Sequence, residues 1–174
     1  AALVAEHGGA LPAVIVANLP YNIATVLILK WLAHPGDFAD IVVMVQKEVA
    51  QRLAAPPRGD AYGRLAVMTQ WRAEVAMLFD LAPGAFTPPP KVTSTVVRIT
   101  PRAAPSTPAE PKAMEAVVRA AFGQRRKMLR SALKALGVDT AALIAAAGIE
   151  PTARAEELSI EEFGKLARAY AALG

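Results

Sequence analysis

Apolar positions follow two different patterns along the chain. In the first hundred residues, short apolar runs alternate with segments of helical periodicity, whereas the rest shows helical periodicity alone. The short apolar run Val14–Val16 predicts a buried strand, and the near-continuous apolar character of Ile41–Val45 predicts a parallel strand that is covered on both faces. Strands are predicted over residues 13–17, 41–45, 75–80 and 95–100. Helices are predicted over residues 23–33, 46–53 and 63–71.

The first predicted helix is apolar on more than one side, so we expect it to be mostly buried, with Asn22 as its N-cap. A stretch with four prolines, Pro101–Pro111, marks a domain boundary. The pattern therefore predicts a partial α/β domain over residues 1–101 and an all-helical domain over residues 102–174. Helices in the second part are predicted over residues 112–122, 125–136, 140–147 and 160–173.

The first predicted strand ends at the tetrapeptide Asn18-Leu19-Pro20-Tyr21. In open α/β sheets, ligands bind at the carboxyl ends of strands, so a site is expected at this turn. Asn18 offers a side-chain carbonyl, and Pro20 holds Leu19 extended with its carbonyl free to accept a hydrogen bond. Two acceptors beside the flat ring of Tyr21 suit a planar amino group such as N6 of adenine. The alternative is a strand–turn–helix junction without a ligand.

A stiff segment, Phe86-Thr87-Pro88-Pro89-Pro90-Lys91-Val92-Thr93-Ser94, precedes the last predicted strand. Three consecutive prolines cannot join a helix or a central sheet ladder, so they hold their neighbours in fixed positions. Phe86 stands outside any periodic apolar pattern. It either fills the core beneath a rigid loop or is presented as a stacking platform for a base.

The strongest charge feature is the segment from Gln124 to Lys134, which holds five cations and no acid. On the predicted helix the cations gather on one side, opposite an apolar stripe of Met128, Leu129, Ala132, Leu133 and Leu136. Solvated helix faces normally mix charges of both signs, so this face favours contact with a phosphate backbone over a merely solvated surface. The cations of the segment are Arg125, Arg126, Lys127, Arg130 and Lys134.

Composition narrows the classes of protein that fit. The chain of 174 residues has a net charge of +4 and is 54% hydrophobic. No apolar run is long enough for a transmembrane helix, so no membrane partner is expected. The absence of cysteine excludes disulfides and thiolate metal sites and suits the cytoplasm; we expect no metal site. The chain begins at Ala1 with no signal peptide, and its beginning looks cut.

Three segments together resemble one family: Asn18–Tyr21, Phe86–Ser94 and Phe122-Gly-Gln-Arg-Arg-Lys127. In order and spacing they are similar to the ribosomal RNA adenine dimethyltransferases, also called dimethyladenosine or kasugamycin-resistance methyltransferases. The resemblance covers nearly the whole chain. It implies dimethylation, from S-adenosylmethionine, of N6 of two adjacent adenosines in a hairpin loop near the 3′ end of small-subunit (16S) rRNA. The implied setting is ribosome biogenesis in the cytoplasm, with a monomer acting on the rRNA or a 30S precursor.

The resemblance also implies a role for each segment. The Asn18 side chain and the Leu19 carbonyl would accept the N6 hydrogens, Pro20 would shape the turn, and Tyr21 and Phe86 would sandwich the adenine. Asn18 would also face the methyl donor. The basic segment, with Lys91, would hold RNA phosphates.

The family binds its donor through a glycine-rich loop and acidic residues that precede this turn. Only 17 residues precede Asn18 here, and none of them forms such a loop, since Gly8-Gly9 is not one. The resemblance thus implies an α/β fold: the C-terminal part of a Rossmann-like class I methyltransferase sheet, then a small all-helical domain. Two alternatives remain at this point. One is a non-catalytic rRNA-binding assembly factor, and the other is a DNA adenine-N6 methyltransferase, whose turn is similar.

Overall fold

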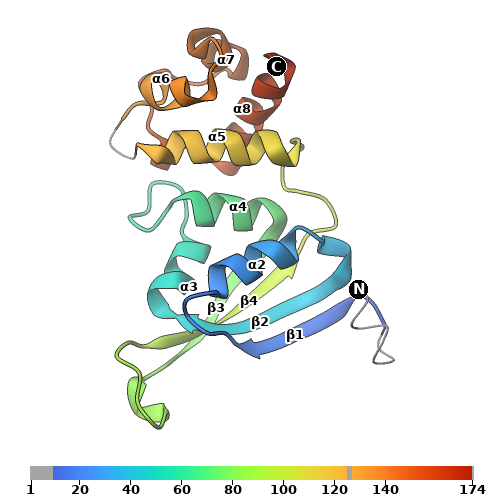
Figure 1. The fold of residues 1–174 in the computed structure, drawn as a ribbon, viewed down its shortest axis with the longest axis vertical. Coiled ribbons are helices and arrows are strands. Elements are labelled where there is room, and N and C mark those ends of the chain that lie inside the picture. The colour runs from blue at the N-terminus through green and yellow to red at the C-terminus, as the bar shows by residue number, and fades with distance from the viewer. Residues whose placement is uncertain (1–9, 125–126, 174) are drawn as a thin grey trace. The chain divides into compact units, whose positions relative to one another are not determined.

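A computed structural model describes residues 10–124 and 127–173. It is a mixed α/β fold (Figure 1) whose strands and helices lie close to the predicted ranges, except for the helix predicted over residues 125–136. The strands are β1 (Ala13–Asn18), β2 (Phe38–Gln46), β3 (Ala73–Leu81) and β4 (Ser94–Pro101). The helices are α2 (Ala24–Leu32), α3 (Lys47–Ala54), α4 (Arg64–Arg72), α5 (Pro111–Gly123), α6 (Leu129–Ala132), α7 (Thr140–Ala147) and α8 (Ile160–Leu173).

The four strands form one mixed sheet in the order β1-β2-β4-β3 (Figure 1). β1 and β2 are parallel, as predicted, with Asn18 opposite Met44 at the end of β1. β4 is antiparallel to both of its neighbours. This order makes β1 an edge strand among the described residues, and it brings the start of β4 beside the end of β2, where Gln46 pairs with Ser94.

Burial alternates along β1 and β2, so the predictions of a buried first strand and of a second strand covered on both faces are wrong. Ile41, Val43 and Val45 of β2 are fully buried, but the residues between them are only partly covered. In β1, Val14 and Val16 are 60% and 78% exposed. A continuous apolar run shows that a strand can be buried on both faces, but only tertiary packing decides how many faces are covered.

Helix α2 differs from its prediction in two ways. It buries a single stripe, Ala24, Ile28 and Leu32, whereas Val26 is 65% exposed, so it is not mostly buried. Asn22 is not its N-cap: Ile23 takes that position without any side-chain hydrogen bond. The helix instead grows out of the preceding turn, in which the Ile23 amide donates to the Pro20 carbonyl at 3.1 Å. No helix of the described residues is long and apolar enough to cross a membrane.

The chain forms two compact units. The first consists of the described part of Ala1–Ala54 with Arg72–Ala103, and the second of Ala55–Trp71 with the described part of Ala104–Gly174. The segment before β3 thus belongs to the helical unit, although it precedes the last two strands in sequence. Its side chains explain the grouping, because Ala66, Val67 and Trp71 of α4 join the same buried cluster as α5 and α8.

The proline-rich stretch is anchored on the second unit. The Trp71 indole donates to the Thr107 carbonyl at 2.8 Å, and the Ser106 amide donates to the Trp71 carbonyl at 2.9 Å. Arg168 of α8 donates to the Thr107 hydroxyl at 3.1 Å and to the Pro108 carbonyl at 2.6 Å. Thr107 is only 4% exposed. This part of the stretch is therefore bound to the helices that it precedes.

Candidate target-base site and basic surface

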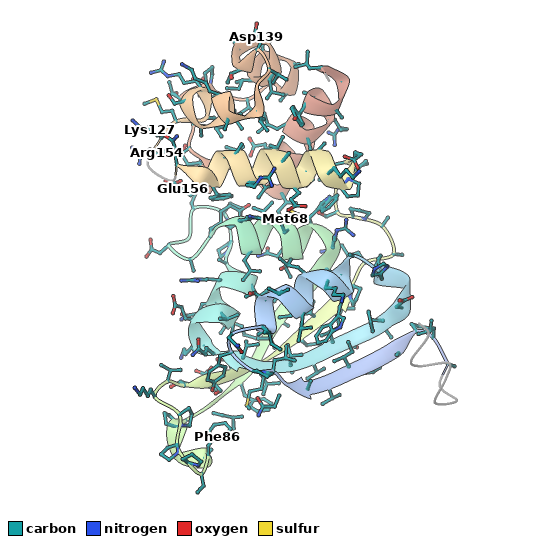
Figure 2. All side chains as sticks on the ribbon, in the orientation of Figure 1. Met68, Phe86, Lys127, Asp139, Arg154 and Glu156 are labelled. Carbon is teal, nitrogen blue, oxygen red and sulfur yellow. The ribbon has the colours of Figure 1, made fainter. Side chains whose placement is uncertain are left out.

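An open hollow of about 320 Å³ lies at the carboxyl ends of β1 and β2, in the first unit. It brings Asn18–Tyr21 together with Phe86, although the two segments are far apart in sequence. Phe86 lies on the loop between β3 and β4 (Figure 2). The residues lining the hollow are Asn18, Leu19, Pro20, Tyr21, Met44, Phe86, Pro88 and Pro90.

The Asn18–Tyr21 turn is fixed by its backbone and by one side-chain contact. The Leu19 amide donates to the Met44 carbonyl at 3.3 Å, and the Leu19 side chain is buried. Among the hydrogen bonds of the described residues, none uses the Asn18 side chain or the Leu19 carbonyl. The hollow therefore has a carbonyl and a side-chain amide available as hydrogen-bonding groups on its lining.

Tyr21 is held by a residue that sequence reasoning did not assign. Its hydroxyl lies 3.0 Å from the hydroxyl of Ser94, which is fully buried at the start of β4. Since Tyr21 itself is 37% exposed, this contact fixes the tip of the ring while one part of the side chain remains accessible. The cue in the sequence was the run of hydroxyl residues Thr93-Ser94-Thr95, but nothing in it specified a partner 73 residues away.

Two further bonds anchor the same end of the loop. The Thr93 carbonyl accepts from the Lys47 amide at 3.0 Å, and the Thr95 hydroxyl donates to Asp80 at 2.7 Å. The Lys47 ammonium also donates to Asp80 at 2.6 Å. These hydrogen bonds, from Lys47 first and Thr95 second, lower the pKa of the Asp80 carboxyl below its usual value. Three consecutive residues, Thr93, Ser94 and Thr95, are thus bonded to the start of α3, to the turn and to β3 in that order.

No group of three or more His, Cys, Asp or Glu side chains in the described part of the chain could hold a metal ion. Lys91 is exposed on the same loop as Phe86 but does not line the hollow.

The predicted basic helix over residues 125–136 does not form as one helix. Arg125 and Arg126 lie outside the described residues. Lys127 lies in a bend, Met128 has an extended backbone (ψ 153°) that bridges to Arg154, and α6 begins only at Leu129. The Leu129 amide donates to the Ala153 carbonyl at 2.8 Å. This pairing supplies hydrogen bonds that a helix would otherwise make.

The cations nevertheless remain exposed. Lys127, Arg130 and Lys134 face solvent, and none has an ion pair within the described residues. The apolar stripe is mostly confirmed, because Leu129, Ala132 and Leu133 are buried and Leu136 packs against the core, but Met128 is exposed. Figure 2 shows Arg154, a cation that sequence reasoning had not assigned to RNA binding, on the same side of the second unit as Lys127.

Comparison with known proteins decides the family. The family model described as ribosomal RNA adenine dimethylase matches residues 10–172. This chain belongs to that family. "Ribosomal RNA small subunit methyltransferase A" of Rhodospirillum rubrum is 58% identical over 166 residues, which cover 95% of this chain and 57% of the relative. The Xanthobacter autotrophicus protein of the same name is 56% identical and covers 91% of this chain and 56% of the relative. The chain thus spans little more than half the length of these relatives.

Solved structures show the same fold. A dimethyladenosine transferase from Plasmodium falciparum has a TM-score of 0.77 at 24% identity, covering 88% of this chain and 64% of that one. The 23S rRNA methyltransferase ErmE has a TM-score of 0.64 at 19% identity, covering 98% of this chain and 75% of that one. These likenesses confirm the predicted Rossmann-like α/β class, and the adenine dimethylase family confirms the predicted resemblance.

Proposed function

We propose that this chain forms the target-base and RNA-binding portion of an S-adenosylmethionine-dependent rRNA adenine-N6,N6-dimethyltransferase. The observation that carries the proposal is the hollow in which Asn18–Tyr21 and Phe86 meet. The proposed substrates are two adjacent adenosines in the 3′-terminal hairpin loop of small-subunit rRNA, bound by a monomer as free rRNA or in a 30S precursor in the cytoplasm. Membership of an rRNA adenine dimethylase family favours RNA over DNA as the substrate.

The hollow would need to position one amino group, N6 of the target adenine. An adenine turned out of the loop would enter between Tyr21 and Phe86, with its N6 hydrogens donated to the Asn18 side chain and the Leu19 carbonyl. Both acceptors draw the nitrogen lone pair out of conjugation with the ring and stabilise the positive charge that develops on N6. A strong base is not required, because the amine becomes acidic as it is alkylated. Catalysis would come mainly from orientation in a preorganised polar site.

The donor would be bound chiefly elsewhere. S-adenosylmethionine would supply the methyl group, but no glycine-rich loop follows a strand in the described residues, and only Asn18 has a proposed role toward the donor. The residues of this chain thus fit the base side of the reaction and not a complete donor site. Accordingly, the steps proposed for this chain are limited to binding RNA, extruding the base and orienting N6.

The two units would have different roles, the first in contacting the base and the second in binding RNA phosphates. The first unit contains every residue proposed to touch the base, and the second contains the exposed cations Lys127, Arg130 and Lys134. Phosphate contacts supply most of the affinity for RNA and carry little sequence information, whereas contacts to an extruded base set the reacting geometry. Lys91, on the loop that carries Phe86, would add a phosphate contact near the base.

The test is Asn18→Ala in the full-length protein, assayed in a single turnover with saturating RNA and donor. We expect methyl transfer to slow by about 10²–10³, the loss typical of one preorganised polar group at a transition state. RNA affinity should change little. Asn22→Ala is the matched control, because Asn22 follows the same turn but does not line the hollow.

Thermal unfolding of both variants must first show that they fold. A folded Asn18→Ala enzyme that transfers methyl groups at the wild-type rate would refute the role of Asn18. If the wild-type protein binds small-subunit rRNA but never methylates it, the alternative of a non-catalytic assembly factor replaces this proposal.

A further inference from the structure

A second and larger hollow, of about 710 Å³, lies wholly within the helical unit. It is bounded by α6 and the 3₁₀ turn that follows it (Leu133–Leu136), by α7, and by the chain near Pro151. Its volume lies in the range of small-ligand sites. The methyl-transfer chemistry proposed above makes no use of it.

The floor of this hollow is apolar. Ile144 and Ile149 are buried beneath it, and Val138 is half-buried. On the α7 side the exposed lining residues are Ala141 and Ala145, whose side chains are single methyl groups. Small side chains above buried aliphatic ones leave room for a planar group to lie against the floor.

The rim is polar and mainly cationic. Arg130, Ser131 and Lys134 are exposed along one edge, and neither cation has an ion pair within the described residues. Thr140 adds a second hydroxyl. The one acid of the lining, Asp139, is engaged as the N-cap of α7, where it accepts from the Ala141 and Ala142 amides at 2.9 and 3.1 Å.

We infer that this hollow holds one unstacked nucleotide of the bound RNA, with its base on the apolar floor and its flanking phosphates on Arg130 and Lys134. Loop RNA is recognised through bases turned out of the stack, whose faces are apolar while their backbone is anionic. The Ser131 and Thr140 hydroxyls suit a ribose 2′-hydroxyl or a base edge.

RNA fits this rim better than a peptide does. Lys127, which lies outside the hollow, is also exposed, so the exposed cations extend further than one nucleotide or one amino acid of a ligand. A regularly charged backbone matches such a set of cations. The inference rests on the proposed RNA-binding function. That function attributes RNA binding by the helical unit to phosphate contacts alone, and the inference adds a contact with a base.

The test measures binding of the full chain to a labelled eight-nucleotide single-stranded RNA of mixed sequence and to an abasic octamer with the same phosphates. Ala145→Leu fills the hollow without changing charge, and Ala146→Leu is its matched control, exposed on the same helix but outside the lining. Circular dichroism verifies that both variants fold.

We expect wild type to prefer the base-bearing RNA over the abasic octamer. Ala145→Leu should reduce that preference by about five- to tenfold, the low end for one stacked base because the floor has no aromatic ring. Ala146→Leu should leave it unchanged. Arg130→Ala should weaken binding of both octamers and lower the salt slope by about 0.7 for each single-strand phosphate that the protein no longer neutralises.

Each other outcome overturns the inference in a different way. If Ala145→Leu keeps the wild-type preference while Arg130→Ala lowers the salt slope, RNA binding stands but the hollow holds no base. If wild type binds neither octamer nor rRNA at low salt, the proposed RNA-binding function itself fails. If Ala145→Leu weakens binding to small ribosomal subunits but not to protein-free rRNA, the occupant is a protein.

Discussion

For Gly164→Ala, the structure and helix propensity predict changes of opposite sign in the free energy of unfolding. The residue lies inside α8, where Gly→Ala usually stabilises a helix by about 1 kcal/mol. A Cβ atom at this position, however, would lie 2.4 Å from Cγ2 and 2.6 Å from Oγ1 of Thr107. These distances are far shorter than van der Waals contact, so either α8 or the proline-rich stretch must move.

Thr107 cannot give way at low cost. Its carbonyl accepts from the Trp71 indole and its hydroxyl accepts from Arg168, so a shift would strain two hydrogen bonds around a buried residue. Overpacking of this kind costs about 1–3 kcal/mol, and the fixed neighbours favour the upper end. After the gain in helix propensity, we expect Gly164→Ala to lower the free energy of unfolding of the second unit by about 2 kcal/mol.

The assay is urea unfolding followed by tryptophan fluorescence in a Trp31→Phe background, which leaves Trp71 in the second unit as the sole reporter. With a slope of about 1 kcal/mol/M, the midpoint should fall by about 2 M. Gly123→Ala is the matched control, because Gly123 ends α5 where an added methyl group would meet no atom within 4 Å, and it should be neutral or slightly stabilising.

Thr107→Ala should relieve the Gly164→Ala defect, so that the double variant is at least about 1 kcal/mol more stable than additivity predicts. The reasoning is refuted if Gly164→Ala raises the midpoint as Gly123→Ala does, or if Thr107→Ala and Gly164→Ala are simply additive.

Two further predictions concern the first unit. Tyr21→Phe and Ser94→Ala should each slow methyl transfer by the full-length protein about fivefold, the value of one hydrogen bond of about 1 kcal/mol, and the double variant should lose no more than either single one; additive losses would show that the contact does not position the ring. Hydrogen bonds from Arg98 first and Thr100 second lower the pKa of the Asp40 carboxyl, so its stabilising contribution is present above the unfolded pKa near 3.9 and is lost as pH falls through the lower folded value. Urea midpoints measured from pH 6 to pH 2 should therefore fall more steeply for wild type than for Asp40→Asn, and parallel curves would contradict the assignment.

The parts of the site that the sequence predicts are those encoded locally. An apolar run that ends at Asn18 and Pro20 identifies the carboxyl end of a strand, and the consecutive prolines that follow Phe86 identify a stiff loop. Topology then places those two segments together, because β4 lies beside β2. The residue roles at the site remain predictions, since the geometry shows proximity and not catalysis.

What the sequence does not predict depends on partners distant along the chain. Helix α4 has a local signal, but nothing local shows that its apolar side chains pack with α5 and α8 rather than with the sheet. The basic segment has helical periodicity, yet Met128 pairs with Arg154 and delays the helix to Leu129. For α4, tertiary packing selects which neighbours a locally encoded helix contacts. For the basic segment, the pairing of Met128 overrides the local preference for a helix.

The anchoring of the β3–β4 loop explains how the base site can be ordered although one of its walls is a loop. At its C-terminal end, Thr93, Ser94 and Thr95 are bonded to Lys47, Tyr21 and Asp80 in turn. The same register that pairs Gln46 with Ser94 thus fixes the Tyr21 ring relative to Asn18. Phe86, at the other end, is held by a short 3₁₀ turn, in which its backbone amide donates a hydrogen bond to the Pro83 carbonyl at 3.2 Å. The Asn18–Tyr21 wall is therefore set by strand pairing, whereas the Phe86 wall is set by the 3₁₀ turn before it and by the stiffness of the prolines that follow it.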